Sequence, residues 1–415
     1  MAYDDDDQCF DFEHIWQTGI KCARGVRWKA SVQRYELFLL ARCGELFIQI
    51  DVGAWLKTTG RFFRFTLYER GHRRDIRSTT ITERNGQKCL CDYSLVQAIQ
   101  PSLIYDNGAT MKNKGITFAE KRMTRMLCHF IQEVGPEAAY ENGYAVLYDF
   151  HGYFDSIVHA ILILIVDRFY TDRRLMETIH KLISDFGEHG LGLGSQISQI
   201  LALVMATGLD HAIKDISRIK VYERYMDDGI CIVPTKEAAN ALLSIVQAMA
   251  SDLKLELNEK KTRIVKLSRG FTFLKIRYQI TSTGKIIRHI AKDGTVRMRN
   301  RLGAYRKKLD AGKIKLENVE MSMEAYFANC DRANSTRTKL SFWYRFRRMF
   351  PESKAFIKKK PIKNIQKELA SYQAVWMKAH PNGSWAAFKR DWKAYLKERD
   401  EKNDVLQISF RRVNR

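Results

Sequence analysis

Hydrophobic and polar positions divide the first third of the chain into helix-like and strand-like stretches. From residue 1 to about 60, apolar residues recur at helical spacing, which predicts two helices. Residues 61–90 change to a period of two, typical of strands. Phe63–Tyr68 and Ile76–Ile81 flank a turn at Glu69–His72 and predict a β-hairpin. Residues 91–135 again follow a helical pattern, interrupted by polar stretches that contain glycine.

Short apolar strands alternate with helices in the middle of the chain. Ala145–Tyr148 predicts a buried strand that leads into Asp149. Lys220–Val233 predicts a strand, a tight turn at Asp227 and Asp228, and a returning strand. Other helices are predicted from about Ser156, over Gln196–Lys214 and over Lys236–Leu253, and other strands over Leu255–Val265 and Phe271–Tyr278. Beyond about residue 285 the chain is helical, basic and aromatic, so the pattern as a whole predicts an α+β protein.

The sequence predicts a cytoplasmic protein without a membrane span. The longest apolar run, Ala160–Val166, is too short to cross a bilayer. The segment Met1–Asp7 is acidic, whereas a secretory signal begins with basic residues. The eight cysteines form no Cys-x-x-Cys pair and are expected to be ordinary reduced thiols.

Positive charge is concentrated in the last third of the chain. Residues 261–415 hold 39 Lys and Arg against 13 Asp and Glu, whereas residues 1–260 hold 31 against 34. A basic region beside a near-neutral one predicts a nucleic-acid partner, and a solvated lysine-rich surface is the alternative. Aromatic residues interleave with the charge over Phe342–Arg348, which favours nucleic acid. Arg345, Arg347 and Arg348 are therefore predicted nucleic-acid contacts.

Acidic residues stand where two of the predicted strands end. Tyr225-Met226-Asp227-Asp228 lies between two apolar strands, and its adjacent carboxylates repel each other unless a cation neutralises them. A second acidic element begins at Asp149, with Phe154-Asp155-Ser156-Ile157 five residues further on. Together these elements predict a divalent-metal site.

The two acidic elements, with the segments around them, resemble the reverse transcriptases. Asp149 with Phe154–Ile157 is similar to motif A of that family, and Tyr225–Asp228 is similar to motif C. Leu191–Gln199 resembles motif B, Leu257–Thr262 resembles motif D and Gly270–Lys275 resembles motif E. The motifs follow in the same order as in the family. The resemblance covers about residues 60–350.

This resemblance implies a right-hand polymerase fold. Its parts would be an N-terminal helical segment (1–60), fingers (61–145), a palm with an antiparallel sheet and helices (146–284), a helical thumb (285–350) and a basic, aromatic C-terminal extension (351–415).

The resemblance also implies RNA-directed DNA polymerase chemistry, in which deoxynucleotides are added by two-metal phosphoryl transfer. Asp149, Asp227 and Asp228 would be catalytic, and with Phe150 they form the predicted metal site. Two Mg²⁺ ions are expected, with Mn²⁺ able to substitute, because Mg²⁺ prefers oxygen ligands. Asp155 is expected to be structural.

Five residues are predicted to bind the nucleotide. Phe154 falls at the family's sugar gate, where a ring excludes a ribose 2′-hydroxyl, although a core aromatic is the alternative. Arg74 would grip the triphosphate or else keep an edge strand soluble. Lys261 would protonate the leaving group or else be a surface lysine. Gly194 and Gln199 belong to the segment that is similar to motif B.

The sequence of the motif B segment indicates which group of reverse transcriptases the chain resembles. Its ending Ser198-Gln199 resembles diversity-generating and unassigned, antiphage defence-associated prokaryotic enzymes, and Leu193 replaces the usual polar residue. The expected partners are a non-coding RNA template, a DNA product and deoxynucleoside triphosphates, and self-association or a partner reverse transcriptase stays open. A mutagenic diversity-generating enzyme and a non-catalytic, maturase-like RNA-binding protein are the alternatives to a defence enzyme.

Overall fold

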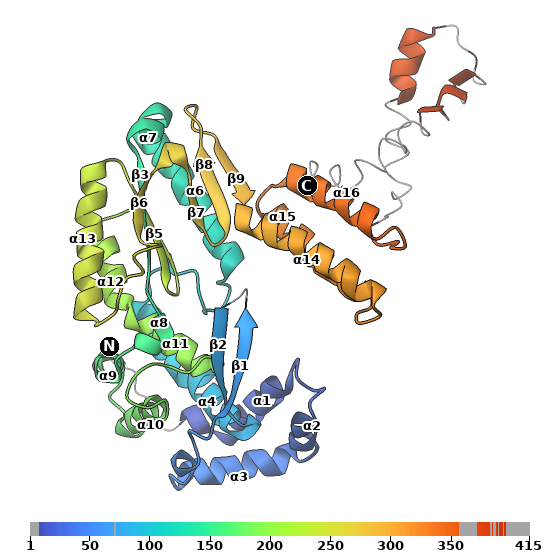
Figure 1. The fold of residues 1–415 in the computed structure, drawn as a ribbon. Helices are drawn as coiled ribbons and strands as arrows, with labels where there is room; N and C mark the ends of the chain where they lie inside the picture. The colour runs from blue at the N-terminus through green and yellow to red at the C-terminus, as the bar shows by residue number, and fades with distance from the viewer. Residues whose placement is uncertain are drawn as a thin grey trace. The chain divides into compact units, whose positions relative to one another are not determined.

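Runs of helices and runs of short strands follow one another along the chain (Figure 1). The structure is a computed structural model that describes residues 8–69, 72–356, 372–381, 384, 387–388, 390–392 and 394–395. Contacts divide the chain into two units, residues 1–274 with 279–286 and residues 275–278 with 287–415. Within the described ranges, no helix is both long and apolar enough to cross a membrane.

The N-terminal stretch forms three helices where the sequence predicted two: α1 (Phe12–Ala23), α2 (Ala30–Leu37) and α3 (Leu39–Asp51). The prediction was wrong because α2 and α3 are separated by Phe38 alone, whose backbone leaves the helical range at φ −114° and ψ 29°. The apolar spacing therefore continues across the break.

A β-hairpin follows, as predicted, in strands β1 (Phe63–Glu69) and β2 (His72–Ser78). The strands pair antiparallel with Phe65 opposite Ile76, and every residue of β1 is exposed. The second strand ends earlier than predicted because Thr80 caps α4 (Ile81–Leu90) by accepting a hydrogen bond from the backbone N–H of Glu83 at 3.2 Å. The turn residues Arg70 and Gly71 lie outside the described residues.

A four-stranded antiparallel sheet with the order β4-β5-β3-β6 forms the centre of the first unit. Its strands are β3 (Tyr144–Asp149), β4 (Val221–Tyr225), β5 (Asp228–Val233) and β6 (Arg263–Lys266). The last strand is shorter than predicted and begins only at Arg263. Helix α13 (Lys236–Asp252) lies along the sheet and buries Leu242 and Val246 (Figure 1).

Two predicted helices are interrupted. The stretch predicted over 196–214 divides into α11 (Gln196–Met205), α12 (Thr207–His211) and a π-helical turn at Ala212–Ile216. The helix predicted from about Ser156 forms α8 (Tyr153–Ser156) and α9 (His159–Val166). The other α-helices of this unit are α5 (Val96–Ile99), α6 (Ile116–Val134), α7 (Pro136–Asn142) and α10 (Arg173–Ser184).

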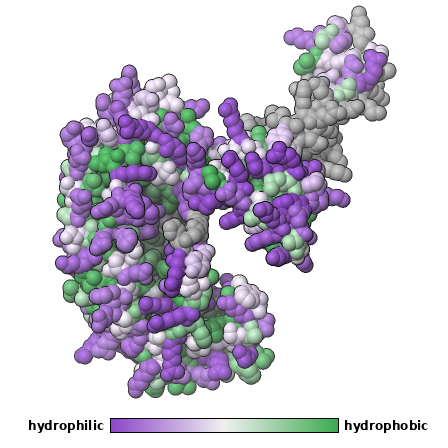
Figure 2. Space-filling model, in the orientation of Figure 1, coloured by the Kyte–Doolittle hydropathy of each residue, from purple (hydrophilic) through white to green (hydrophobic). Residues whose placement is uncertain are grey.

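Residues 271–290 form a three-stranded sheet of β7 (Phe271–Phe273), β8 (Ile276–Ile280) and β9 (Ile286–Ile290). The second unit continues with α14 (Lys292–Asp310), α15 (Leu316–Arg332) and α16 (Thr336–Met349). These helices enclose their own core, which includes Leu302, Val319 and Phe346, and the face that they show in Figure 2 is mainly hydrophilic. The predicted α+β class is confirmed.

Candidate active site

The acidic residues singled out by the sequence meet at one end of the central sheet. Asp149 ends β3 and Asp228 begins β5, and the two residues are paired in the antiparallel register. Such partners lie about 4.5–5.5 Å apart at Cα. Asp227 occupies the two-residue turn between β4 and β5. The side chain of Asp149 is buried, with the residue 2% exposed.

These carboxylates are short of positive charge. Burial raises the pKa of Asp228, and its hydrogen bond with Asp149 and the charge of Asp227 raise it further. Burial and the charge of Asp149 also raise the pKa of Asp227, while Lys261 and Arg74 act to lower it. A bound divalent cation would stabilise the ionised forms that burial and mutual repulsion disfavour.

Lys261 forms an ion pair with this cluster. Its Nζ donates to Oδ1 of Asp149 at 2.7 Å, while 59% of its side chain stays exposed. The backbone N–H of Asn258 donates to the carbonyl of Asp149 at 2.7 Å, so residues 258–261 are fastened to the end of β3. The lysine therefore contacts an oxygen that a metal would use.

The donor set fits Mg²⁺. Across the described ranges, no group of three or more His, Cys, Asp or Glu side chains is arranged as a complete metal site. Mg²⁺ does not need one, because it takes one or two carboxylates and completes its shell with water and substrate phosphates. The ring of Phe150 is buried and stacks on Tyr153 with centroids 5.2 Å apart, so only the main-chain carbonyl of Phe150 could serve as a ligand.

A cavity of about 480 Å³ lies beside the turn that holds Asp227. Phe154, which is half-buried, lines it together with exposed Gly194, exposed Gln199 and Met226. Its other lining residues are Ala109, Thr110, Met111, Lys114, Gly115, Leu193 and Tyr225. Ligand pockets commonly measure about 300–1,000 Å³. Three of the predicted nucleotide-binding residues thus share one cavity of suitable size.

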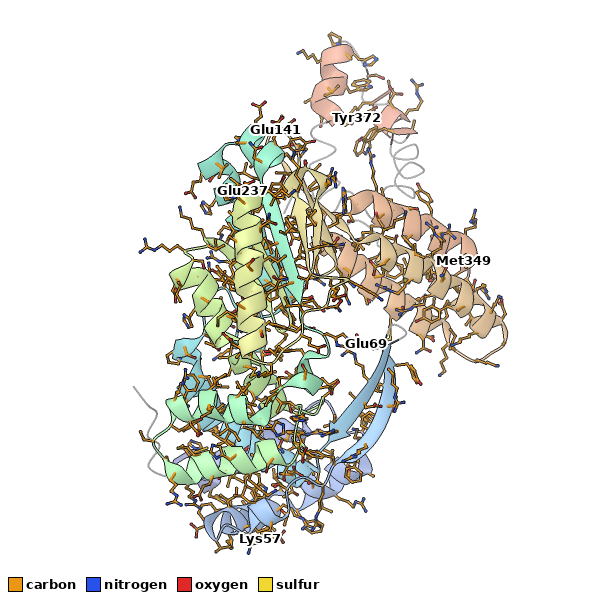
Figure 3. The ribbon with its side chains drawn as sticks, turned by 60° about the vertical axis from the view of Figure 1, so that its left-hand side comes forward. Lys57, Glu69, Glu141, Glu237, Met349 and Tyr372 are labelled. Atoms are coloured by element: carbon orange, nitrogen blue, oxygen red, sulfur yellow. The ribbon has the colours of Figure 1, made fainter. Side chains whose placement is uncertain are left out.

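The hairpin that carries Arg74 is hydrogen-bonded to the loop that contains Leu193 and Gly194. The backbone N–H of Arg77 donates to the carbonyl of Leu193 at 3.0 Å. Gly194 has φ +118°, and a Cβ there would lie 3.0 Å from Cγ2 of Ile76, so glycine permits the close approach. The guanidinium of Arg74 pairs at 2.9 Å with Glu69, which Figure 3 labels at the end of β1.

The predicted nucleic-acid contacts lie on α16 in the second unit. Phe342, Trp343 and Phe346 are buried in the helical core, so these aromatics are unavailable for stacking on bases. Arg348 is exposed, and the guanidinium of Arg347 donates to the carbonyl of Ser353 at 3.0 Å. Arg345 and Arg347 are half-buried, and of the interleaved rings only Tyr344 is exposed, at 41%.

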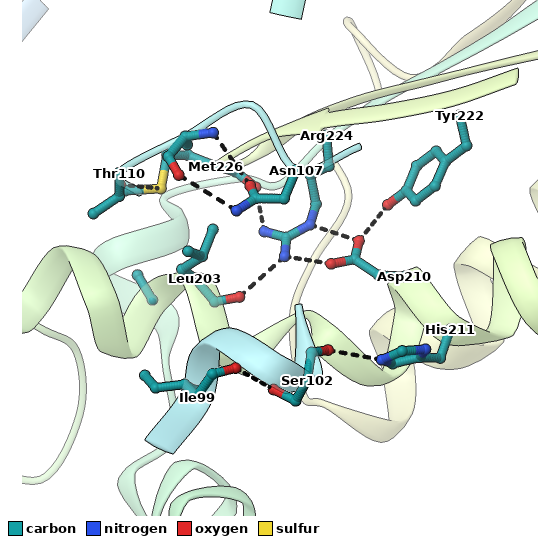
Figure 4. Close-up of polar contacts among 12 residues, drawn as sticks. Ile99, Ser102, Asn107, Thr110, Leu203, Asp210, His211, Tyr222, Arg224 and Met226 are labelled. Atoms are coloured by element: carbon teal, nitrogen blue, oxygen red, sulfur yellow. Dashed lines mark hydrogen bonds and ion pairs between the residues drawn. The ribbon is translucent and has the colours of Figure 1, made fainter. Parts of the chain in front are cut away.

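Sequence reasoning missed a buried ion pair behind the turn. Arg224 precedes Tyr225 in β4, Asp210 lies on α12, and their side chains are fully buried (Figure 4). A signal was available, because Glu223 and Arg224 are consecutive charged residues inside an otherwise apolar strand. Lys114, which lines the cavity, was not among the predicted nucleotide-binding residues.

Comparison with known proteins supports a family for part of the chain. Residues 88–278 match the family model described as reverse transcriptase (RNA-dependent DNA polymerase). No curated protein matches the sequence.

Telomerase structures are among the similar solved structures, at low similarity. Apo telomerase from Candida tropicalis is 14% identical with a TM-score of 0.40, over 55% of this chain and 49% of that one. Telomerase from Candida albicans with a TWJ fragment of telomeric RNA is 10% identical with a TM-score of 0.47, over 79% and 63%. The chain thus spans about half to three-fifths of their length.

Proposed function

Residues 88–278 belong to the reverse transcriptase (RNA-dependent DNA polymerase) family. On that premise we propose that this chain extends a primer with deoxynucleotides at Asp149, Asp227 and Asp228. The supporting observation is the register of the central sheet, which sets Asp149 opposite Asp228 with Asp227 in the adjoining turn. The right-hand polymerase fold predicted from the sequence is confirmed by the match to this family. The predicted domain limits remain part of the proposal.

In this proposal, each side chain around the carboxylates has its own role in the reaction. Two metal ions, when bound, favour the ionised primer hydroxyl and neutralise the leaving pyrophosphate. The carboxylates would hold them, with the carbonyl of Phe150 as a further ligand. Phe154 would exclude a 2′-hydroxyl from the cavity, and Arg74 would orient the triphosphate with its guanidinium. Lys261 would give a proton to the departing pyrophosphate.

The test is incorporation of labelled deoxynucleotides by purified protein with Mg²⁺, an RNA template and a DNA primer. We expect the Asp227→Ala/Asp228→Ala variant to lose incorporation while it still binds RNA. Asp155→Asn is the matched control, because Asp155 is exposed and on α8. Equal incorporation by wild type and the double variant would overturn the proposal.

For the biological role, we propose that the enzyme copies a cognate non-coding RNA in antiphage defence. Support comes from the Ser198-Gln199 ending, from Leu193 in the cavity wall and from the charge of residues 261–415. Sequencing of the co-purified RNA and of the DNA product, with phage plating on cells that carry wild type or the double variant, tests this role. Products mutated within a repeated target gene would favour the diversity-generating alternative. RNA binding without incorporation would favour the maturase-like one.

A further inference from the structure

The buried ion pair behind the turn joins helix α12 to strand β4. Nε of Arg224 donates to Oδ1 of Asp210 at 2.7 Å, and Nη2 donates to Oδ2 at 2.6 Å. Neither side chain has any exposed surface. Apolar residues of similar volume often replace a buried ion pair without loss of stability. Stability alone therefore does not account for a pair at this place.

Two further hydrogen bonds of Arg224 reach the catalytic turn and helix α11. Nη1 donates to the carbonyl of Met226 at 3.1 Å, and Nη2 also donates to the carbonyl of Leu203 at 3.0 Å (Figure 4). Leu203 lies on α11, so one guanidinium fixes the distance between that helix and the residue before Asp227. A planar guanidinium imposes this geometry, which an ammonium group cannot reproduce.

The turn needs such a support because Met226 has φ +57°. Residues other than glycine keep this left-handed conformation only where surrounding contacts impose it. The hydroxyl of Thr110 adds a contact at 3.6 Å to the sulfur of Met226. Without the bond from Arg224, the turn can relax and carry Asp227 away from Asp149.

The same carboxylate is connected to the strand that carries Asp149. The hydroxyl of Tyr222 donates to Oδ1 of Asp210 at 2.6 Å, and it lies 2.7 Å from the hydroxyl of Tyr148. Tyr148 directly precedes Asp149 in β3. The buried pair is thus linked to the turn before Asp227 through Arg224, and to the strand of Asp149 through Tyr222 and Tyr148.

We propose that Arg224 and Asp210 are positioning residues, which hold Asp227 and Asp149 at the separation that the reaction needs. This inference rests on the proposed polymerase function. The pair touches neither the carboxylates nor the cavity, so its effect is exerted through the backbone of Met226 and through Tyr222.

The decisive variant replaces both partners with apolar residues, Arg224→Met together with Asp210→Leu. The single change Arg224→Met should lower the melting temperature, because it leaves Asp210 charged and buried. The double change should recover most of that loss. We expect its kcat to stay about 100-fold below wild type, since misplacement of a reacting group by about 1 Å costs about that much. Its Mg²⁺ concentration for half-maximal rate should rise, while KM for the nucleotide changes little.

His211→Gln is the matched control, because His211 neighbours Asp210 on α12 but contacts Ser102 and Asp215 instead of the turn. Its kcat and Mg²⁺ dependence should match wild type. A double variant that regains wild-type kcat together with its stability would refute the positioning role. Absence of activity in wild type itself would refute the proposed function instead, so the two failures are distinguishable.

Discussion

Glu223 is a carboxyl group that lies fully buried with no hydrogen-bond partner for either oxygen among the described residues. Burial raises its pKa to about 9, and the charge of Asp106 adds to this rise, while Arg122, Lys114 and Lys214 oppose it. The group is therefore protonated in the folded protein at neutral pH. In the unfolded chain it titrates near its ordinary value of 4.5.

This difference makes the stability of the protein depend on pH in a calculable way. Between pH 4.5 and 9 the folded state holds a proton that the unfolded chain has released, so stability falls as pH rises. The full slope is about 1.4 kcal/mol per pH unit, or about 4 kcal/mol from pH 5.5 to 8.5. Glu223→Gln cannot release a proton, so its free energy of unfolding should lack this contribution.

Urea denaturation of wild type and Glu223→Gln at pH 5.5, 7 and 8.5 measures the difference. The variant should gain stability relative to wild type at each step upward in pH. Burying the amide without a hydrogen bond costs about 1–3 kcal/mol at every pH, so it shifts the whole curve and leaves this change with pH unaltered. Glu237→Gln, an exposed change in the first turn of α13, is the control and should run parallel to wild type. Parallel curves for Glu223→Gln as well would refute the reasoning.

Three further changes test individual contacts. Lys261→Met frees Asp149 from its ion pair, so the Mg²⁺ concentration for half-maximal incorporation should fall, by about fivefold for each 1 kcal/mol that the pair contributes; an unchanged or higher requirement contradicts this. Phe154→Val opens the cavity wall, so discrimination against ribonucleotides should weaken about 10–200-fold in kcat/KM comparisons, and unaltered discrimination would make the ring structural. Gly229→Ala places a methyl group 2.1 Å from the ring of Tyr148, so the free energy of unfolding should fall by about 1–3 kcal/mol or more in thermal unfolding. An unchanged free energy of unfolding would mean that the ring can move aside.

The acidic cluster was accessible from the sequence because each member ends or begins a strand of clear period. Asp149 follows four apolar residues, and Asp227 and Asp228 separate two apolar runs, so local pattern alone placed them at strand ends. Antiparallel pairing then brings such ends together, as the register of Asp149 with Asp228 shows. Their positions could be predicted without knowing which residues far apart in the sequence are in contact.

The ion pair of Arg224 and Asp210 could not be derived in the same way. The two residues are 14 positions apart, and their meeting depends on how the predicted helix over 196–214 breaks at Ala206. Apolar residues continue through that break, so the sequence pattern does not reveal it. The burial of Phe342, Trp343 and Phe346 could not be derived from the sequence for a related reason. Alternation of aromatic and basic residues looks the same whether the rings meet bases or, as found, a helical core.

The contrast between the exposed hairpin and the buried sheet has a consequence for how activity is lost. All seven residues of β1 are exposed, whereas β3 and β5 are buried at every position but their first. Local opening requires little free energy where few apolar contacts are broken, and approaches the global value in a core strand. Under mild heat or denaturant, amide exchange should therefore accelerate in the hairpin with Arg74 while the strands that carry Asp149 and Asp228 stay protected. The proposed contact of Arg74 with the triphosphate would then be lost first and reversibly, whereas the carboxylate cluster would be lost only when the whole first unit unfolds.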